Sequence, residues 1–235
     1  MNPLIPGRLF PNLFGKPVGQ MFDISPGDEE INNAVGLVET VHRFSHEIEE
    51  KLWVRRGVTK NDLDPEGEYT GNTELGRAIG ITIKSDTADP VFAFLHEVGH
   101  YIDHRLLLPL GEFASTREHI LDAMRDWRRA VENTQRYKVL KAEERRLIEA
   151  QEGPKDRRLL AVVQYRLQIR ELFARSYAQY IIVRCPDEWA QNLVTGRLAD
   201  PEKQDFVWEL EDFVPVAEAI DELFLRRAWL QAEQP

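Results

Sequence analysis

The spacing of hydrophobic positions divides the first part of the chain into one helix and two strands. Between Asp28 and Lys51, apolar side chains recur at intervals of three and four residues, which predicts an amphipathic helix. The segment Leu52–Val58 predicts a short strand, and residues 78–84 alternate in the manner of a second strand. Between them, Lys60–Thr73 is polar and rich in turn-forming residues, which predicts a loop.

A second helix is predicted directly after the second strand. Asp89 and Pro90 form a start signal, because Asp is a preferred N-cap and Pro fits the first helical position. Pro109 and Gly111 form the stop signal. Apart from a His-Glu-His set, residues 91–102 are uncharged, as expected for a helix at the floor of a cleft. The apolar stripe of this helix consists of Leu95, Val98, Gly99, Ile102 and Leu106.

The second half of the chain is predicted to be helical. Residues 115–118, Ser-Thr-Arg-Glu, have the sequence of a capping box, which predicts a charged helix that continues to about Gln151. Gly153-Pro154 predicts a turn, and a second long helix follows over Asp156–Arg184. The two helices would form an antiparallel hairpin.

We therefore predict a helix-rich α+β fold with a small β-sheet. Residues 1–28 are rich in Pro and Gly and predict an arm that is either docked by its aromatic side chains or disordered. Residues 29–235 are long enough for one domain. Within it, 112–165 would be an inserted charged hairpin, and the acidic part 186–235 would form two or three shorter helices.

Composition excludes several classes of protein. The net charge of −10 argues against non-specific binding of nucleic acid. Cys185 is the only cysteine, which excludes an intrachain disulfide and a thiolate zinc site. Residues 1–20 lack the apolar run of a signal peptide, and no apolar stretch approaches the roughly 18 residues of a membrane span. We expect a cytoplasmic protein that has neither nucleic acid nor a membrane as its partner.

The most informative motif lies on the second helix, where residues 96–100 read His-Glu-Val-Gly-His. On a helix, His96 and His100 lie one above the other and can bind one zinc ion, while Glu97 points to the water or peptide beside it. The alternative is a chance pattern in which both histidines are ordinary core residues. The uncharged flanks and the helix start signal favour the metal site.

A catalytic zinc ion needs a third protein ligand and an open position for water. His104 is eight residues from His96, about 12 Å along a straight helix, and is excluded on that ground. Glu118 is a candidate, but the capping box already accounts for it.

Glu171 is the stronger candidate for the third ligand. It lies on an otherwise apolar helix face with Ala174 and Ala178, where a buried carboxylate needs a strong partner such as a metal. The small residues would let this helix approach the metal helix closely. The alternative is an ion pair between Glu171 and either Arg170 or Arg175.

These motifs resemble those of the zincin metallopeptidases of gluzincin type. Residues 96–103, followed by Glu171-Leu172-Phe173-Ala174, look like the motifs of the anthrax lethal factor catalytic domain and its bacterial and phage relatives. The resemblance covers roughly residues 75–185 and implies a zincin-like fold, one zinc ion per chain and a bacterial or phage origin. The chain departs from the pattern at Arg175, where relatives commonly have an acidic residue, and in the 70 residues between His100 and Glu171.

A weaker resemblance links the chain to the ImmA/IrrE-type peptidases of phage and stress regulation. Glu171, Ala174, Tyr177 and Ala178 fit their Glu-x-x-Ala-x-x-aromatic-Ala outline. Those proteins usually place the Glu much sooner and often carry a helix-turn-helix, for which the chain has no signal.

The motif and the resemblance together imply a mechanism for hydrolysis of a protein or peptide. Zinc would lower the pKa of its bound water, and Glu97 would act as general base and then as general acid toward the leaving amine. The oxyanion needs a further donor, for which Tyr165, Tyr177, Tyr180 and His119 are candidates, and we choose Tyr165. The alternative is a zincin-fold binding or regulatory protein without turnover, although retention of Glu97 argues against it.

Two further features of the predicted site leave alternatives open. Asp103 follows His100 by three residues and would either orient a ligand as an outer partner or be an exposed polar residue. The strand before the metal helix would either offer a free edge to an extended substrate or be an ordinary buried strand. The residues of that candidate substrate edge are Gly80, Ile81, Thr82 and Ile83.

Overall fold

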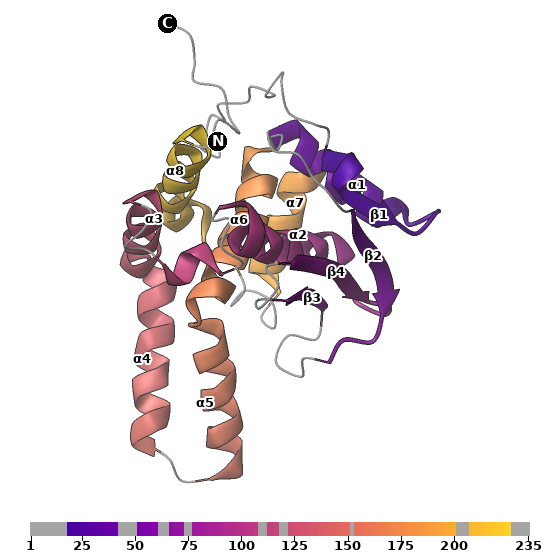
Figure 1. Ribbon diagram of the computed structural model, residues 1–235. Coiled ribbons are helices and arrows are strands. Elements are labelled where there is room, and N and C mark those ends of the chain that lie inside the picture. The colour runs from indigo at the N-terminus through magenta and orange to yellow at the C-terminus, as the bar shows by residue number, and fades with distance from the viewer. Residues whose placement is uncertain are drawn as a thin grey trace, which may run out of the picture.

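The molecule combines a small mixed β-sheet with many helices (Figure 1), which confirms the α+β, helix-rich expectation. The structure is a computed structural model, and it describes residues 18–41, 51–60, 66–72, 77–107, 112–117, 122–150, 153–200 and 207–226. The sheet has the order β1-β2-β4-β3. Its strands are β1 (Phe22–Ile24), β2 (Leu52–Gly57), β3 (Gly67–Asn72) and β4 (Arg77–Lys84).

Strand β4 is an interior strand, so the predicted free edge at residues 80–83 is wrong. Gly80 pairs with Trp53 of the parallel strand β2 on one side and with Thr70 of the antiparallel strand β3 on the other. Both Ile81 and Ile83 are fully buried, as an apolar strand requires when it lies between two others. Among the described strands, β3 is the edge strand on this side of the sheet.

Strand β3 lies within Lys60–Thr73, the segment that the sequence predicts as a loop. The side chains of its residues are mostly polar, and only Gly67 is buried. Strand formation here depends on pairing with β4, because the segment has neither alternation nor β-branched residues in number.

The described part of the predicted N-terminal arm belongs to the folded domain. Residues Val18–Met21 form a 3-10 turn, and the next three form β1, which pairs with β2. Met21 and Phe22 are buried. Helix α1 (Glu29–Val41) follows, and residues 42–50 of the longer helix that the sequence predicts lie outside the described ranges.

Helix α2 (Pro90–Tyr101) carries the His-Glu-Val-Gly-His motif and begins where the sequence predicts. The side chain of Asp89 accepts a hydrogen bond from Phe92 N at 3.2 Å, and Pro90 is the first helical residue. All twelve residues of α2 are buried. The helix continues as a π-helical turn, Ile102–Leu106, and the predicted stop at residues 109–111 lies outside the described ranges.

The two long helices predicted after residue 115 are each divided in two. Thr134 separates α3 from α4, because its Oγ1 donates to Val131 O and accepts from Tyr137 N. The second break, at Leu167 and Gln168, contains no Gly or Pro. The helices are α3 (Asp122–Asn133), α4 (Gln135–Ala150), α5 (Pro154–Arg166), α6 (Ile169–Arg184), α7 (Glu188–Ala199) and α8 (Leu210–Arg226).

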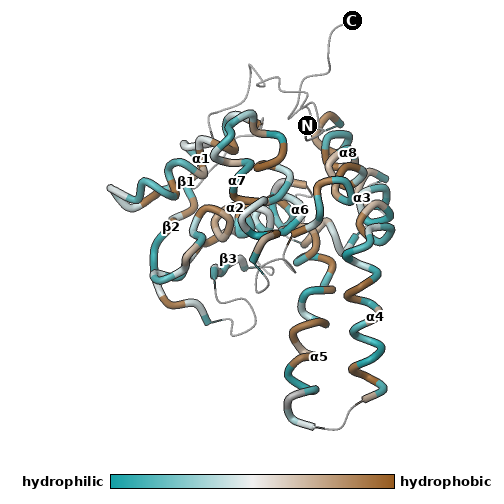
Figure 2. Tube along the Cα trace, turned by 180° about the vertical axis from the view of Figure 1, so that it is seen from behind, coloured by the Kyte–Doolittle hydropathy of each residue, from teal (hydrophilic) through white to brown (hydrophobic). Residues whose placement is uncertain are grey.

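The predicted hairpin is present but is formed by α4 and α5 alone. The two helices lie side by side and project from the body in both views (Figures 1 and 2). Hydrophilic and hydrophobic positions alternate along both helices (Figure 2), as expected for a pair that packs on itself and meets solvent elsewhere. In the described part of the chain, no helix has the length and apolar character that crossing a membrane requires.

Arg197 joins helix α7 to the start of α2. The Arg197 side chain is 3% exposed, donates from Nε to Asp89 Oδ2 at 2.6 Å and from Nη2 to Glu66 Oε2 at 2.8 Å, and lies over the Phe92 ring. One arginine thus connects the N-cap of α2 to the residue that precedes β3. A buried Arg with two carboxylate partners fixes this junction, because loss of either contact would leave a partly buried charge unpaired.

Candidate metal centre and cleft

Three predicted ligands converge in the core of the molecule. His96 Nε2 lies 3.3 Å from Glu171 Oε2, and His100 Nε2 lies 3.4 Å from Glu171 Oε1. One potential ligand atom from each residue lies within 4.8 Å of the others, and all three residues are buried. Together they could hold a metal ion.

The convergence depends on the close crossing of α2 and α6. A β-carbon at Gly99 would lie 2.7 Å from the α-carbon of Ala174. Only a glycine on α2 and a small residue on α6 allow this approach, which supports the prediction that small residues would bring the two helices together. Glu171, one turn before Ala174, thereby faces both histidines.

The ion pairs that were the alternative explanation for Glu171 are not formed as close contacts. Arg170 Nε lies 3.9 Å from Glu171 Oε1, beyond hydrogen-bonding distance. Buried Glu171 Oε2 has no hydrogen-bond partner within the described ranges. Burial alone would raise the pKa of Glu171, but His100 and His96 outweigh it and hold the pKa well below its ordinary value.

Arg175, the departure from the family pattern, stabilises the helix junction instead. Its Nε donates to the backbone carbonyl of Glu171 at 3.1 Å, and Nη2 donates to the carbonyl of Arg166, the last residue of α5. The guanidinium therefore joins the end of α5 to the first turn of α6. An acidic residue at this position could donate neither hydrogen bond.

A cavity of about 150 Å³ opens beside two of the three candidate ligands, His100 and Glu171. Both Tyr165, the predicted oxyanion donor, and Glu97, the predicted general base, line this cavity. Glu97 is 3% exposed. The lining consists of Gly67, Glu68, Tyr69, Glu97, His100, Phe113, Tyr165, Arg170 and Glu171.

Strand β3 forms one wall of this cleft, and aromatic side chains fix it to the π-helical turn that follows α2. The hydroxyl of Tyr69 lies 2.7 Å from Nδ1 of His104, and the His104 ring stacks on Phe113 with centroids 5.1 Å apart. The Phe113 ring in turn lies edge-on to His100. His104 therefore supports the wall and, as predicted, is not in the ligand cluster.

Asp103 is not an exposed polar residue, which was one of the two alternatives that the sequence left open. It is fully buried, and it accepts hydrogen bonds from Ser115 N at 2.7 Å and Ser115 Oγ at 2.6 Å. Within the described ranges His100 Nδ1 has no hydrogen-bond partner, so Asp103 does not orient that ligand directly. Burial raises the pKa of Asp103 to about 6, against the opposing effect of Ser115.

The predicted capping box at residue 115 is wrong, because the Ser115 side chain binds Asp103 and does not cap a helix. Ser115 lies inside a 3-10 turn, Ala114–Thr116, and its hydroxyl is committed to Asp103. This contact holds the turn that follows Phe113 against the π-helical turn at the end of α2. Glu118, the other candidate ligand, and His119 lie outside the described residues.

The remaining tyrosine candidates lie away from the cleft. Tyr180 donates to Asp221 Oδ1 at 2.8 Å, and Tyr177 is fully buried against Phe224. Of the three tyrosines considered, Tyr165 alone lines the cavity. Four lining residues had no role in the sequence-based prediction, namely Gly67, Glu68, Tyr69 and Phe113, because only the tertiary fold brings β3 and residue 113 close to α2.

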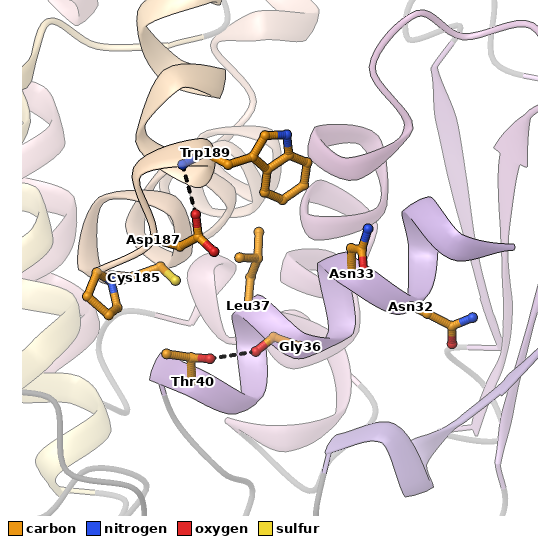
Figure 3. A pocket seen from close by; sticks show the side chains of 9 residues that line it. Asn32, Asn33, Gly36, Leu37, Thr40, Cys185, Asp187 and Trp189 are labelled. Carbon is orange, nitrogen blue, oxygen red and sulfur yellow. Dashed lines mark hydrogen bonds between the residues drawn. The ribbon is translucent and has the colours of Figure 1, made fainter.

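A second hollow, of about 630 Å³, lies between α1 and the junction of α6 and α7 (Figure 3). Two of its polar groups are engaged locally: Asp187 accepts from Trp189 N at 2.8 Å, and Thr40 Oγ1 donates to Gly36 O. Among its lining residues there is no histidine, and burial raises the pKa of the Cys185 thiol. This hollow lacks the grouping of reactive side chains found beside α2.

Comparison of the chain with protein-family models, curated proteins and solved structures finds no match. The likeness to zincin metallopeptidases is therefore carried by the short motifs at residues 96–103 and 171–174. The geometry of the cleft, rather than any relative, indicates which chemistry the site could perform.

Proposed function

We propose that the protein is a zinc-dependent peptidase of the zincin type. The observation that carries the proposal is the convergence of His96, His100 and Glu171 in one buried cluster, with Glu97 in the adjoining cavity. Two histidines on one helix turn and a carboxylate from a second helix form the donor set of a catalytic zinc site that leaves a fourth position open.

The distances between the ligand atoms fit such an ion. In a tetrahedral site with bonds of about 2.0–2.1 Å, neighbouring ligand atoms lie about 3.3–3.4 Å apart. The two separations between Glu171 oxygens and histidine nitrogens are 3.3 and 3.4 Å. For a hydrogen bond these distances are long, and Glu171 Oε2 makes none in the described part of the structure.

When bound, zinc would supply a Lewis acid that polarises the substrate carbonyl and brings the pKa of a water molecule toward neutrality. Glu97 would accept the proton of that water and deliver it to the leaving amine. Tyr165 would donate a hydrogen bond to the oxygen on which negative charge develops. The outer edge of β3, the last of the described strands on this side of the sheet, would pair with an extended peptide, in place of the β4 edge that the sequence suggested.

The metal claim is tested by elemental analysis of purified protein and of a Glu171→Ala variant. We expect one zinc per chain in the wild type and a strong loss of zinc in the variant. Absence of zinc from the wild type after reconstitution, or full retention by the variant, would overturn the ligand set.

The activity claim is tested with peptide pools and with casein as protein substrate. Cleavage should be abolished by a chelator, restored by zinc, and absent from a Glu97→Gln variant that retains its metal. If zinc-loaded wild type cleaves no more than Glu97→Gln, the protein is a zincin-fold binding protein without turnover.

A further inference from the structure

Arg170 is a cationic side chain at the mouth of the cleft. It is the second residue of α6 and directly precedes the third ligand, Glu171. Its side chain is 47% exposed, yet it lines the same cavity as Glu97 and His100. Among the lining residues it carries the one guanidinium or ammonium group.

Neighbouring side chains position the Arg170 guanidinium, but their contacts in the described part of the chain do not use all of its hydrogen-bond donors. Nε donates to Gln168 Oε1 at 3.2 Å, and the group lies 5.8 Å from the centroid of the Phe113 ring. Glu171 Oε1 is 3.9 Å from Nε, too far for a hydrogen bond. For the two terminal nitrogens no acceptor is found in the described part of the chain, so both can serve a ligand.

The charges around the cavity restrict which ligand group can lie there. Glu68, Glu97 and Glu171 contribute carboxylates to the lining and oppose an anion elsewhere in the cavity. Beside Arg170 an anion is favoured instead. The planar fork of an Arg side chain matches a carboxylate, which it binds through two parallel hydrogen bonds.

We infer, on the basis of the proposed peptidase function, that Arg170 binds a carboxylate of the substrate and so determines specificity. The protein then prefers peptides that place a negative charge close to the scissile bond. That charge comes either from an Asp or Glu side chain or from the free C-terminus of a short peptide, and the two sources are separable by experiment.

Three peptide pools of one length distinguish these cases. The first contains Asp and Glu and has an amidated C-terminus. The second replaces every Asp by Asn and every Glu by Gln and is also amidated, and the third is the second with a free C-terminus. With zinc-loaded wild type, kcat/KM should be about tenfold or more higher for the first or the third pool than for the second, as expected for a charge-assisted hydrogen bond.

Variants then assign the preference to Arg170. In Arg170→Gln the ratio of kcat/KM between charged and neutral pools should fall to about one, and Arg170→Glu should favour pools enriched in Lys and Arg. Arg158→Gln is the matched control, because it removes the same charge from an exposed position on α5. Its ratio should equal that of the wild type.

Binding gives a readout that does not need turnover. In a zinc-loaded Glu97→Gln background, calorimetric titration should show tighter binding of the charged pool, and the additional Arg170→Gln change should remove the difference. The specificity role is wrong if the wild type cleaves peptides without a charge preference. It is also wrong if Arg170→Gln lowers kcat/KM equally for all three pools. In both cases the peptidase proposal stands. If no pool is cleaved but charge-dependent binding persists, the carboxylate site stands and the peptidase proposal fails. If the peptides are neither cleaved nor bound, both proposals are overturned.

Discussion

Gly67 of β3 lies so close to Glu97 of α2 that a β-carbon at position 67 would be 2.6 Å from Glu97 Oε1 and 2.8 Å from its Cγ. The wall of the cleft at this point is bare backbone. Any side chain there would have to displace the proposed general base. The space that the Glu97 carboxylate needs therefore explains a glycine at this position, which its place in an edge strand alone does not explain.

Gly67→Ala should reduce peptidase activity without removing the metal. The added methyl group pushes the Glu97 carboxylate out of position, and misplacement of a general base by about 1 Å costs on the order of 100-fold in rate. The measurement is kcat/KM together with zinc content. Gly196→Ala on α7, where a β-carbon meets nothing within 4 Å, is the control and should retain full activity. Unchanged activity in Gly67→Ala would show that Glu97 does not need its present position.

Gly99→Ala should loosen the metal centre itself. The new β-carbon would lie 2.7 Å from Ala174 Cα and 2.9 Å from its carbonyl oxygen, so α2 and α6 must separate. Overpacking of this kind costs about 1–3 kcal/mol of stability. We expect a lower melting temperature and weaker zinc affinity, measured by competition with a chelator. Gly36→Ala on α1, with nothing within 4 Å, should not weaken either property.

Tyr165→Phe should lower kcat while zinc content stays at the wild-type level. Loss of one oxyanion donor typically costs about 100-fold to 1,000-fold in kcat, and KM should change little because the contact forms in the transition state. Tyr137→Phe on α4 is a control outside the cleft. An equal loss of activity in both variants would assign the effect to packing.

Asp28 provides a test of stability against pH at the start of α1. Its carboxylate accepts from Arg56 Nε at 2.8 Å and from Ile31 N at 3.3 Å. The hydrogen bond from Arg56 is the largest cause that lowers the pKa of Asp28 below its ordinary value of 3.8, against a smaller effect of burial. The stabilisation is therefore complete above pH 3.8 and is lost as the pH falls through the lowered pKa.

The matching variant is Asp28→Asn, which keeps an N-cap side chain but removes the charge. Relative to wild type it should lose about 1 kcal/mol of unfolding free energy near neutral pH, and the difference should vanish in strong acid. Urea unfolding in the presence of a chelator measures this without a contribution from metal release. A difference that persists unchanged in acid would mean that the ion pair is not its cause.

Local signals predicted the start of α2 and the spacing of its two histidines. Asp89-Pro90 fixes the start of α2 through a contact between residues three apart, so the sequence window contains both partners. Histidine spacing within one helix is likewise a local property. The place of Glu171 beside the two histidines was also predicted. A carboxylate on an apolar helix face needs a partner, wherever that partner lies in the chain.

The features that the sequence did not reveal depend on partners far along the chain. Ser115 has the sequence context of an N-cap, but its hydroxyl binds Asp103, which is buried and needs donors. Strand β3 forms because β4 offers it an open edge, which its own polar residues do not reveal. The break before α6 has no Gly or Pro, and the Arg175 side chain that secures it lies beyond the break.

The placement of the three ligands also has a consequence for folding. His96 and His100 share α2, but Glu171 reaches them only when α6 has packed against that helix. An unfolded chain would have to close a loop of about 70 residues to recruit the third ligand, at a cost in chain entropy. With zinc bound as proposed, tight metal binding would therefore belong to the native state, and at saturating metal each increment of affinity would add equally to the free energy of unfolding.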